Sequence, residues 1–174
     1  MPRATNVIAA QERGSQTAAD TVILDYARRS AGNGMVVSVK GQSIELDLHA
    51  AARLRTDDLL LLEDGSHVEV VAAAEPLIEV RGADLAALAR IAWHLGDRHI
   101  AAQLLPKRIR VLRNPDVEKL LGALGAKVTA IEAPFEPEGG AYAPQASAHD
   151  HHHSHDHDHS HDHAHLHDHK HHHD

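Results

Sequence analysis

Short apolar runs separated by turn residues dominate the first half of the chain. Four such runs flank two Gly-containing turns, the runs covering residues 36–39, 44–48, 59–62 and 68–71 and the turns lying at 40–42 and 64–65. Apolar runs of this length around Gly-containing turns are typical of β-hairpins. We therefore predict a small all-β domain over residues 21–74, after a flexible N-terminus over residues 1–20.

The second half of the chain alternates between strand and helix patterns. Asp84 precedes apolar residues at helical spacing through Leu95, with Gly96 as the predicted stop, and Asn114-Pro115 begins a second helix. Extended runs flank these helices at residues 77–80, 100–105, 109–112 and 127–131. The resulting order β-α-β-β-α-β predicts a ferredoxin-like domain, to which we assign residues 75–145.

Histidine is concentrated at the C-terminal end of the chain. Fifteen of the 19 histidines lie in the last 26 residues, where every odd-numbered position from 149 to 173 is His and six Asp are interspersed. Because this segment has almost no apolar side chain to bury, we predict a disordered tail over residues 146–174. The predicted fold class is therefore α+β, with a small N-terminal all-β domain, a ferredoxin-like βαββαβ domain and a His-rich tail.

The composition of the tail predicts metal binding. Neutral imidazole binds Ni(II), Zn(II), Cu(II) and Co(II), and the carboxylates add oxygen ligands. Because ligands on one flexible chain act at roughly millimolar effective concentration, we expect several ions in rapid exchange. The candidate ligands are His149, His151, His152, His153, His155, His157, His159, His161, His163, His165, His167, His169, His171, His172 and His173.

Two considerations limit what the tail alone implies. An affinity tag is the alternative origin, but a tag is usually a short run of pure His, whereas this segment is long and mixed with Asp and Ser. Cu(II) binds such ligands more tightly than the other divalent ions, so the tail cannot select the metal.

Composition and charge exclude several other functions. The chain has no Cys, which excludes disulfides, thiolate zinc sites and thiol catalysis. Of the formal net charge of −8, the segment 149–174 carries −5 (six Asp and one Lys), so the rest is almost neutral. With four aromatic residues and no basic excess, we expect no nucleic-acid binding. No segment approaches the roughly 18 apolar residues of a membrane span, and no signal peptide is recognisable, so we expect a cytoplasmic protein.

His94 and His99 are the candidate metal residues of the folded part. A separation of five residues places two side chains roughly 140° apart on a helix, so they cannot form the i, i+4 clamp of a helical zinc site. We expect His94 to have a supporting role at the helix end and His99, beyond the helix, to be accessible. Two copies of His99 near the two-fold axis of a dimer would form a bis-imidazole site that tail imidazoles complete. A solvated His99 without a metal is the alternative, and His49 and His67 are expected to be ordinary surface residues.

Two motifs resemble the UreE family of urease accessory proteins. The hexapeptide His94-Leu95-Gly96-Asp97-Arg98-His99 is similar to that family's His-Leu-Gly-Asn-Arg-His, with Asp97 where Asn is usual. Residues 134–142, Pro-Phe-Glu-Pro-Glu-Gly-Gly-Ala-Tyr, are similar to its Pro-Phe-x-Pro-Glu-x-Gly-Ala-Tyr. Residues 57–65 and the His-rich end also fit, and the resemblance covers the chain after residue 20.

The resemblance implies a nickel metallochaperone rather than an enzyme. It implies a homodimer formed through the ferredoxin-like domain, with His99 of both subunits holding Ni(II) at the interface. It implies nickel delivery to apo-urease together with the GTPase UreG and other accessory proteins, and a β-domain similar to peptide-binding modules that carries partner contacts. Some relatives have two further histidines at the positions that Arg113 and Pro115 occupy here. Neither an Arg nor a Pro side chain binds metal.

Judged from the sequence alone, two other functions remain possible alternatives. A metal buffer would explain the tail but leaves the two folded domains without a role. A metallohydrolase using His94 and His99 lacks a nearby Glu base, and the chain has neither a Gly-rich phosphate loop nor a nucleophile elbow. The adjacent carboxylates Asp57-Asp58 and Glu63-Asp64 are expected in solvated loops.

Overall fold

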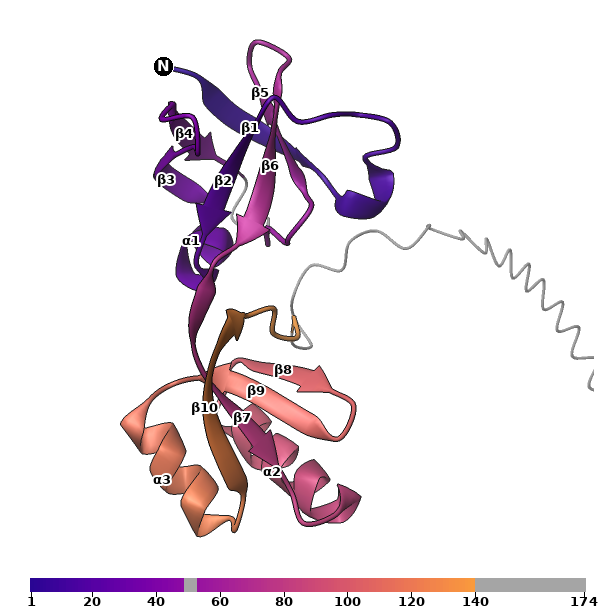
Figure 1. Cartoon of the computed structure of the whole chain (residues 1–174), viewed down its shortest axis with the longest axis vertical. Coiled ribbons are helices and arrows are strands. Elements are labelled where there is room, and N and C mark those ends of the chain that lie inside the picture. Colours follow the sequence, from indigo (N-terminus) through magenta and orange to yellow (C-terminus); the bar gives the residue numbers. More distant parts are fainter. Residues whose placement is uncertain (49–52, 140–174) are drawn as a thin grey trace, which may run out of the picture. The chain divides into compact units, whose positions relative to one another are not determined.

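The computed structural model of the chain describes residues 1–48 and 53–139 (Figure 1). His49 and the fifteen predicted tail ligands lie outside the described residues. Within the described ranges, no helix combines the length and the apolar composition that crossing a bilayer requires.

The N-terminal part is built on a six-stranded sheet with the order β2-β6-β5-β1-β4-β3. Its strands are β1 (Arg3–Ile8), β2 (Asp20–Leu24), β3 (Asn33–Val37), β4 (Ser43–Asp47), β5 (Leu59–Leu62) and β6 (His67–Ala72). Alternate residues of these strands point into one aliphatic core, which includes Val22, Leu24, Ile44, Leu46, Val68 and Val70. The N–H of Val39 donates to the carbonyl of Thr21 at 2.8 Å, so the two edge strands β2 and β3 approach each other and the sheet nearly closes. The β-rich domain predicted from the sequence is therefore confirmed.

The start of the chain differs from the prediction. Residues 1–20 were expected to be flexible, but β1 lies inside the sheet, parallel to β4 and antiparallel to β5. Ala4 is fully buried, and a 3-10 turn follows at Ala10–Glu12. A short helix, α1 (Tyr26–Ala31), also interrupts the predicted all-β region, with Asp25 as its N-cap. Strand β1 depends on partners distant in the sequence, so its local pattern did not reveal it. Helix α1 does carry local signals, the N-cap Asp25 and the left-handed Gly32 at its end, which the prediction missed.

The second part has the predicted ferredoxin-like order of elements. These are β7 (Ala74–Arg81), α2 (Leu85–Asp97), β8 (Ala102–Leu105), β9 (Arg108–Leu112), α3 (Pro115–Ala123) and β10 (Lys127–Pro134). They form an antiparallel sheet with the order β10-β7-β9-β8, and both helices pack on one of its faces (Figure 1). The core between helices and sheet contains Ile78, Val80, Ile91, Leu95, Ile109, Val111 and Leu121.

The helix starts are as predicted, but the end of α2 is not. The side chain of Asp84 accepts the N–H of Ala87 at 2.7 Å, and Asn114 accepts the N–H of Asp116 at 2.8 Å. Gly96, the predicted stop, lies within α2, which continues to Asp97. The left-handed residue that ends this region is instead His99, with φ +54°.

Gly82, between β7 and α2, is predicted to be intolerant of any side chain. A Cβ there would lie 2.6 Å from the backbone N of Leu88 and 2.9 Å from the carbonyl O of Asp84. Because these are main-chain atoms of the first turn of α2, Gly82→Ala should lower the free energy of unfolding by about 1–3 kcal/mol, measured by urea denaturation.

The matched control is Gly122→Ala, in the last turn of α3. A Cβ at Gly122 would meet no atom within 4 Å. Alanine is favoured over glycine inside a helix, so this variant should be more stable by about 0.5–1 kcal/mol. If Gly82→Ala were as stable as Gly122→Ala, the close approach of the loop to α2 would be wrong.

Candidate metal centre

His99 lies directly beyond the last turn of α2 and is exposed. Its N–H donates to the carbonyl of Gly96, and the N–H of Ile100 donates to the carbonyl of Leu95, both at 2.9 Å. These hydrogen bonds satisfy carbonyls at the C-terminal end of the helix. The turn thus fixes the backbone of His99 and leaves its imidazole open to ligands.

The backbone of His99 lies in the left-handed region, which few residues other than Gly adopt. A residue other than Gly with φ near +54° pays roughly 1–2 kcal/mol relative to the right-handed region, and Gly or Asn is the common choice at such helix ends. Strained positions of this kind cluster at functional sites. The conformation is therefore consistent with a functional reason for an imidazole at this position.

His94, on the last turns of α2, is held by its neighbours. A guanidinium nitrogen of Arg98 lies 3.3 Å from Nδ1 of His94 and donates to its carbonyl at 3.2 Å. Because a guanidinium only donates, Nδ1 acts as the acceptor and the ring hydrogen belongs on Nε2. The Trp93 ring packs edge-on at 4.9 Å. These contacts suit the supporting role predicted for His94, which stays a prediction.

The described residues do not bring a full set of metal ligands together in one chain. Within residues 1–48 and 53–139, no group of three His, Cys, Asp or Glu side chains is arranged to hold an ion. His67, at the start of β6, is partly exposed and belongs to the sheet of the β-rich part. Arg113 pairs with Glu118 at 3.1 Å, and Pro115 is the first residue of α3. The candidate centre therefore consists of the accessible imidazole of His99, with His94 near the end of the preceding helix α2.

Exposed apolar side chains lie on the elements next to His99. Trp93 on α2 is 64% exposed and Leu104 on β8 is 51% exposed. Helix α2 contacts β8, so both elements belong to the same end of this fold. On the outer side of α2, the exposed residues Ala86 and Ala89 precede Trp93 at helical spacing. Exposed apolar side chains on neighbouring elements are typical of an interface.

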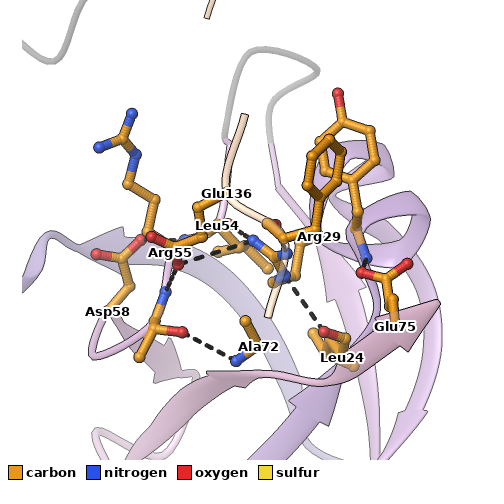
Figure 2. A network of polar contacts seen from close by, with 11 residues as sticks. Leu24, Arg29, Leu54, Arg55, Asp58, Ala72, Glu75 and Glu136 are labelled. Atoms are coloured by element: carbon orange, nitrogen blue, oxygen red, sulfur yellow. Dashed lines mark hydrogen bonds and ion pairs between the residues drawn. The ribbon is translucent and has the colours of Figure 1, made fainter. Parts of the chain in front are cut away.

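A buried polar cluster in the β-rich part was not predicted from the sequence. Arg29 of α1 is only 2% exposed and donates to the carbonyls of Leu24, Leu54 and Phe135 (Figure 2). Phe135 directly follows β10, so this guanidinium ties the segment after β10 to α1. The role of Arg29 is structural, and the one signal in the sequence that could point to it is the Pro-Phe-Glu-Pro-Glu motif that begins at Pro134.

Asp58 and Glu136 complete this cluster. Glu136 accepts the N–H of Thr56 at 2.9 Å, and Asp58 accepts the N–H of Arg55 at 2.7 Å (Figure 2). Asp58 also accepts the N–H of Ala10 at 3.0 Å. The expectation that Asp58 lies in a solvated loop was wrong, because the residue is 5% exposed. Burial raises the pKa of the Asp58 carboxyl, although the two N–H groups oppose that rise.

Comparison with known proteins gives a consistent result over both parts of the chain. Residues 3–73 match the family described as UreE urease accessory protein, N-terminal domain, and residues 75–174 match its C-terminal domain. The urease accessory protein UreE of Rhodopseudomonas palustris (strain BisB18) is 53% identical over 152 residues, which cover 87% of this chain and 72% of that protein. The UreE proteins of Bradyrhizobium sp. (strain BTAi1) and Beijerinckia indica subsp. indica are 49% and 44% identical over 154 residues each, covering 87% of this chain and 74% and 86% of those proteins.

Proposed function

Because the chain belongs to the UreE family of urease accessory proteins, we propose that it captures Ni(II) and delivers it for assembly of the urease metallocentre. Family membership places the protein in urease maturation as an accessory protein and not as an enzyme. The observation that carries the nickel proposal is the exposed imidazole of His99, held in a left-handed turn at the end of α2.

The proposed mechanism is capture followed by ligand exchange. Imidazoles of the tail, within 149–174, take up Ni(II) and raise its concentration near the folded part. They pass the ion to His99, with His94 in support, and the recipient then removes it. No covalent bond of a substrate changes. Exchange is fast because the ligands are neutral nitrogen and carboxylate oxygen, without thiolate, and Zn(II), Cu(II) and Co(II) are expected to bind the same groups.

A homodimer is part of the proposal. A single imidazole holds an ion weakly, whereas a two-fold axis near His99 brings the same residue of a second copy to the site. The exposed apolar side chains of Trp93 and Leu104 support an interface at this end of the ferredoxin-like part. Two copies of His99 would then share one nickel ion, and tail imidazoles would complete its coordination.

The proposed partners are the urease apoprotein and its accessory proteins, including the GTPase UreG, in the cytoplasm. We expect neither nucleic acid nor a membrane as a partner. A metal buffer without a client is the main rival, and a pull-down of urease components on the nickel-loaded protein separates the two. A metallohydrolase is disfavoured because Arg98 already engages Nδ1 of His94.

The proposal is tested by nickel titration calorimetry on the full chain and on a chain ending at Ala148. Shortening should lower the stoichiometry yet leave about one nickel per dimer. Because imidazole binds only when neutral and has a reference pKa of about 6.5, the capacity of the full chain should fall between pH 7.5 and pH 5.5. Equal capacity at both pH values would rule out imidazole as the main ligand, and a shortened chain that binds no nickel would rule out the bridging site.

A further inference from the structure

One face of the ferredoxin-like sheet carries a cluster of basic side chains. Alternation along β7 and β9 turns Ile78, Val80, Ile109 and Val111 toward the helices, so Glu79, Arg81, Arg108 and Arg110 lie on the opposite face. In the strand register Glu79 is paired with Arg110, and Arg81 with Lys127 of β10. We call Arg81, Arg108, Arg110 and Lys127, together with the central Glu79, the basic face.

The single carboxylate of the basic face does not balance its cations. Glu79 is 13% exposed and lies 2.8 Å from Arg81, 3.5 Å from Arg108 and 3.4 Å from Arg110. Burial alone would raise the pKa of Glu79, but the three guanidinium groups hold it below its usual value, so the group is ionised at neutral pH. The basic face thus holds four cations and one carboxylate, a formal charge of +3, on a chain whose net charge is −8.

The guanidinium groups are also not fully used within the described structure. Nε of Arg108 is buried and lies 3.5 Å from Glu79 without forming a hydrogen bond to it, so only the terminal nitrogens of Arg108 are open to a further ligand. Arg81 and Arg108 remain 54% and 37% exposed. Arginine binds carboxylates through two parallel N–H donors, which is the strongest form of such pairing. The basic face therefore retains donor capacity for further carboxylates.

The spacing of the cations matches an extended acidic peptide. Arg108 and Arg110 stand two residues apart on β9, a repeat of about 6.6–6.8 Å along the strand, and Arg81 lies on the neighbouring strand about 4.8 Å away. Carboxylates at alternate positions of an extended peptide repeat at the same distance of about 6.6–6.8 Å. One acidic strand can thus meet both arginines of β9 without distortion of either partner.

We propose that the basic face binds an acidic, extended segment of the protein that exchanges metal with this chain. The inference rests on the proposed function for the identity of that protein as a metal-exchange partner. Nucleic acid fits less well, because β7, β8, β9 and β10 carry no aromatic side chain on which a base could stack.

The chain's own acidic segment, 149–174, is the rival occupant. Its formal charge is −5 with neutral imidazoles. Each bound Ni(II) adds two positive charges, so three ions are enough to reverse that sign. In the nickel-loaded state the segment no longer complements the basic face, whereas an acidic segment of a partner still does. The loaded protein, which is the form that meets a recipient, therefore favours the partner.

The test uses the full chain and a fluorescently labelled peptide of alternating Glu and Ser, with a Gln-Ser peptide of equal length as control. Fluorescence anisotropy should show binding of the Glu-Ser peptide only, weakened by added salt. Binding should be at least as tight after nickel loading and removal of free metal. No binding, equal binding of the Gln-Ser peptide, or loss of binding on nickel loading would each overturn the proposal, as would tighter binding of single-stranded DNA of the same charge.

Variants locate the binding to the basic face. Replacing Arg108 and Arg110 together by Gln should weaken the peptide about tenfold, equivalent to about 1.4 kcal/mol. Arg90→Gln, on the exposed side of α2, is the matched control and should leave binding unchanged. Glu79→Gln removes the one carboxylate and should tighten binding, a gain that simple damage to the fold cannot produce.

The same set of proteins separates the two hypotheses. If Arg90→Gln weakened the peptide as much as the double variant, the proposed location would be wrong. Nickel calorimetry on each sample reports metal binding independently of the peptide. A protein that binds nickel normally but not the acidic peptide would contradict the basic-face proposal alone, and a protein that binds the peptide but not nickel would contradict the proposed function alone.

Discussion

His99→Asn is expected to abolish the tightest nickel site of the dimer while leaving the fold intact. Replacing even an outer-shell partner of a metal site typically costs 10–100-fold in affinity, so loss of the ligand itself should cost on the order of 100-fold or more. Asn is among the residues that accept the left-handed region best, so φ +54° at this position stays accessible. The hydrogen bonds that close α2 come from main-chain N–H groups and should persist.

The measurement is a nickel titration in the presence of a competing chelator, with dimer mass and thermal unfolding recorded on the same samples. His67→Asn is the matched control, because His67 lies on β6 in the other sheet. It should leave the tight site unchanged. Retention of full nickel affinity and urease activation by His99→Asn would contradict the assigned role of His99, whatever the tail binds.

Phe135→Ala is expected to be among the most destabilising single substitutions in the described structure. The Phe135 ring is fully buried and packs edge-on against Tyr26 of α1, with ring centroids 5.2 Å apart. Truncation of a buried Phe to Ala typically costs about 3–5 kcal/mol, through lost burial and the cavity left behind. The contact between the two rings contributes about 0.5–1.5 kcal/mol of this.

Urea unfolding of Phe135→Ala and of Val128→Ala provides the comparison. Val128 lies on β10 and is 45% exposed, so its truncation should change the free energy of unfolding by no more than about 0.5 kcal/mol. Arg29→Met should also destabilise the protein, because it leaves the buried carbonyls of Leu24 and Leu54 without a donor. A Phe135→Ala protein within about 1 kcal/mol of the parent would show that the segment after β10 is not anchored to α1.

The ferredoxin-like part was the most predictable region because its signals are local. Asp84 and Asn114 cap the two helices with their own side chains, and the apolar pattern around each fits one face of a helix. The end of α2 was less predictable. Gly96 favours a stop by its residue type, but two main-chain hydrogen bonds place the left-handed residue three positions later, at His99.

The features that escaped prediction depend on contacts between residues far apart in the sequence. Strand β1 is held by β4 and β5, and Arg29 is held by a carbonyl 106 positions away, at Phe135. In the sequence, Arg29 is indistinguishable from a solvated arginine of a short helix, and Asp58 from an acidic loop residue. Their burial follows from the tertiary fold, which no periodicity in the sequence records.

His99 was identified correctly as accessible because it falls just beyond a recognisable helix. Its role as a metal ligand stays a prediction, as do those of His94 and of the tail. The basic face escaped notice because Glu79, Arg81, Arg108 and Arg110 come from two separate strands, and only their antiparallel register unites them. A net charge summed along the sequence does not reveal such a cluster.

The protection of strand edges has a consequence for storage of this protein at high concentration. The N–H of Val39 bridges the edges of β2 and β3, and the N–H of Glu138 donates at 2.9 Å to the carbonyl of Ala102, on the outer edge of β8. Both contacts occupy groups that another chain could otherwise recruit for intermolecular sheet growth. Among the described strands, β10 has β7 on one side and no strand on the other. Aggregation through strand addition should therefore begin along Lys127–Pro134. Introducing a second lysine into this strand should improve the solubility of the protein.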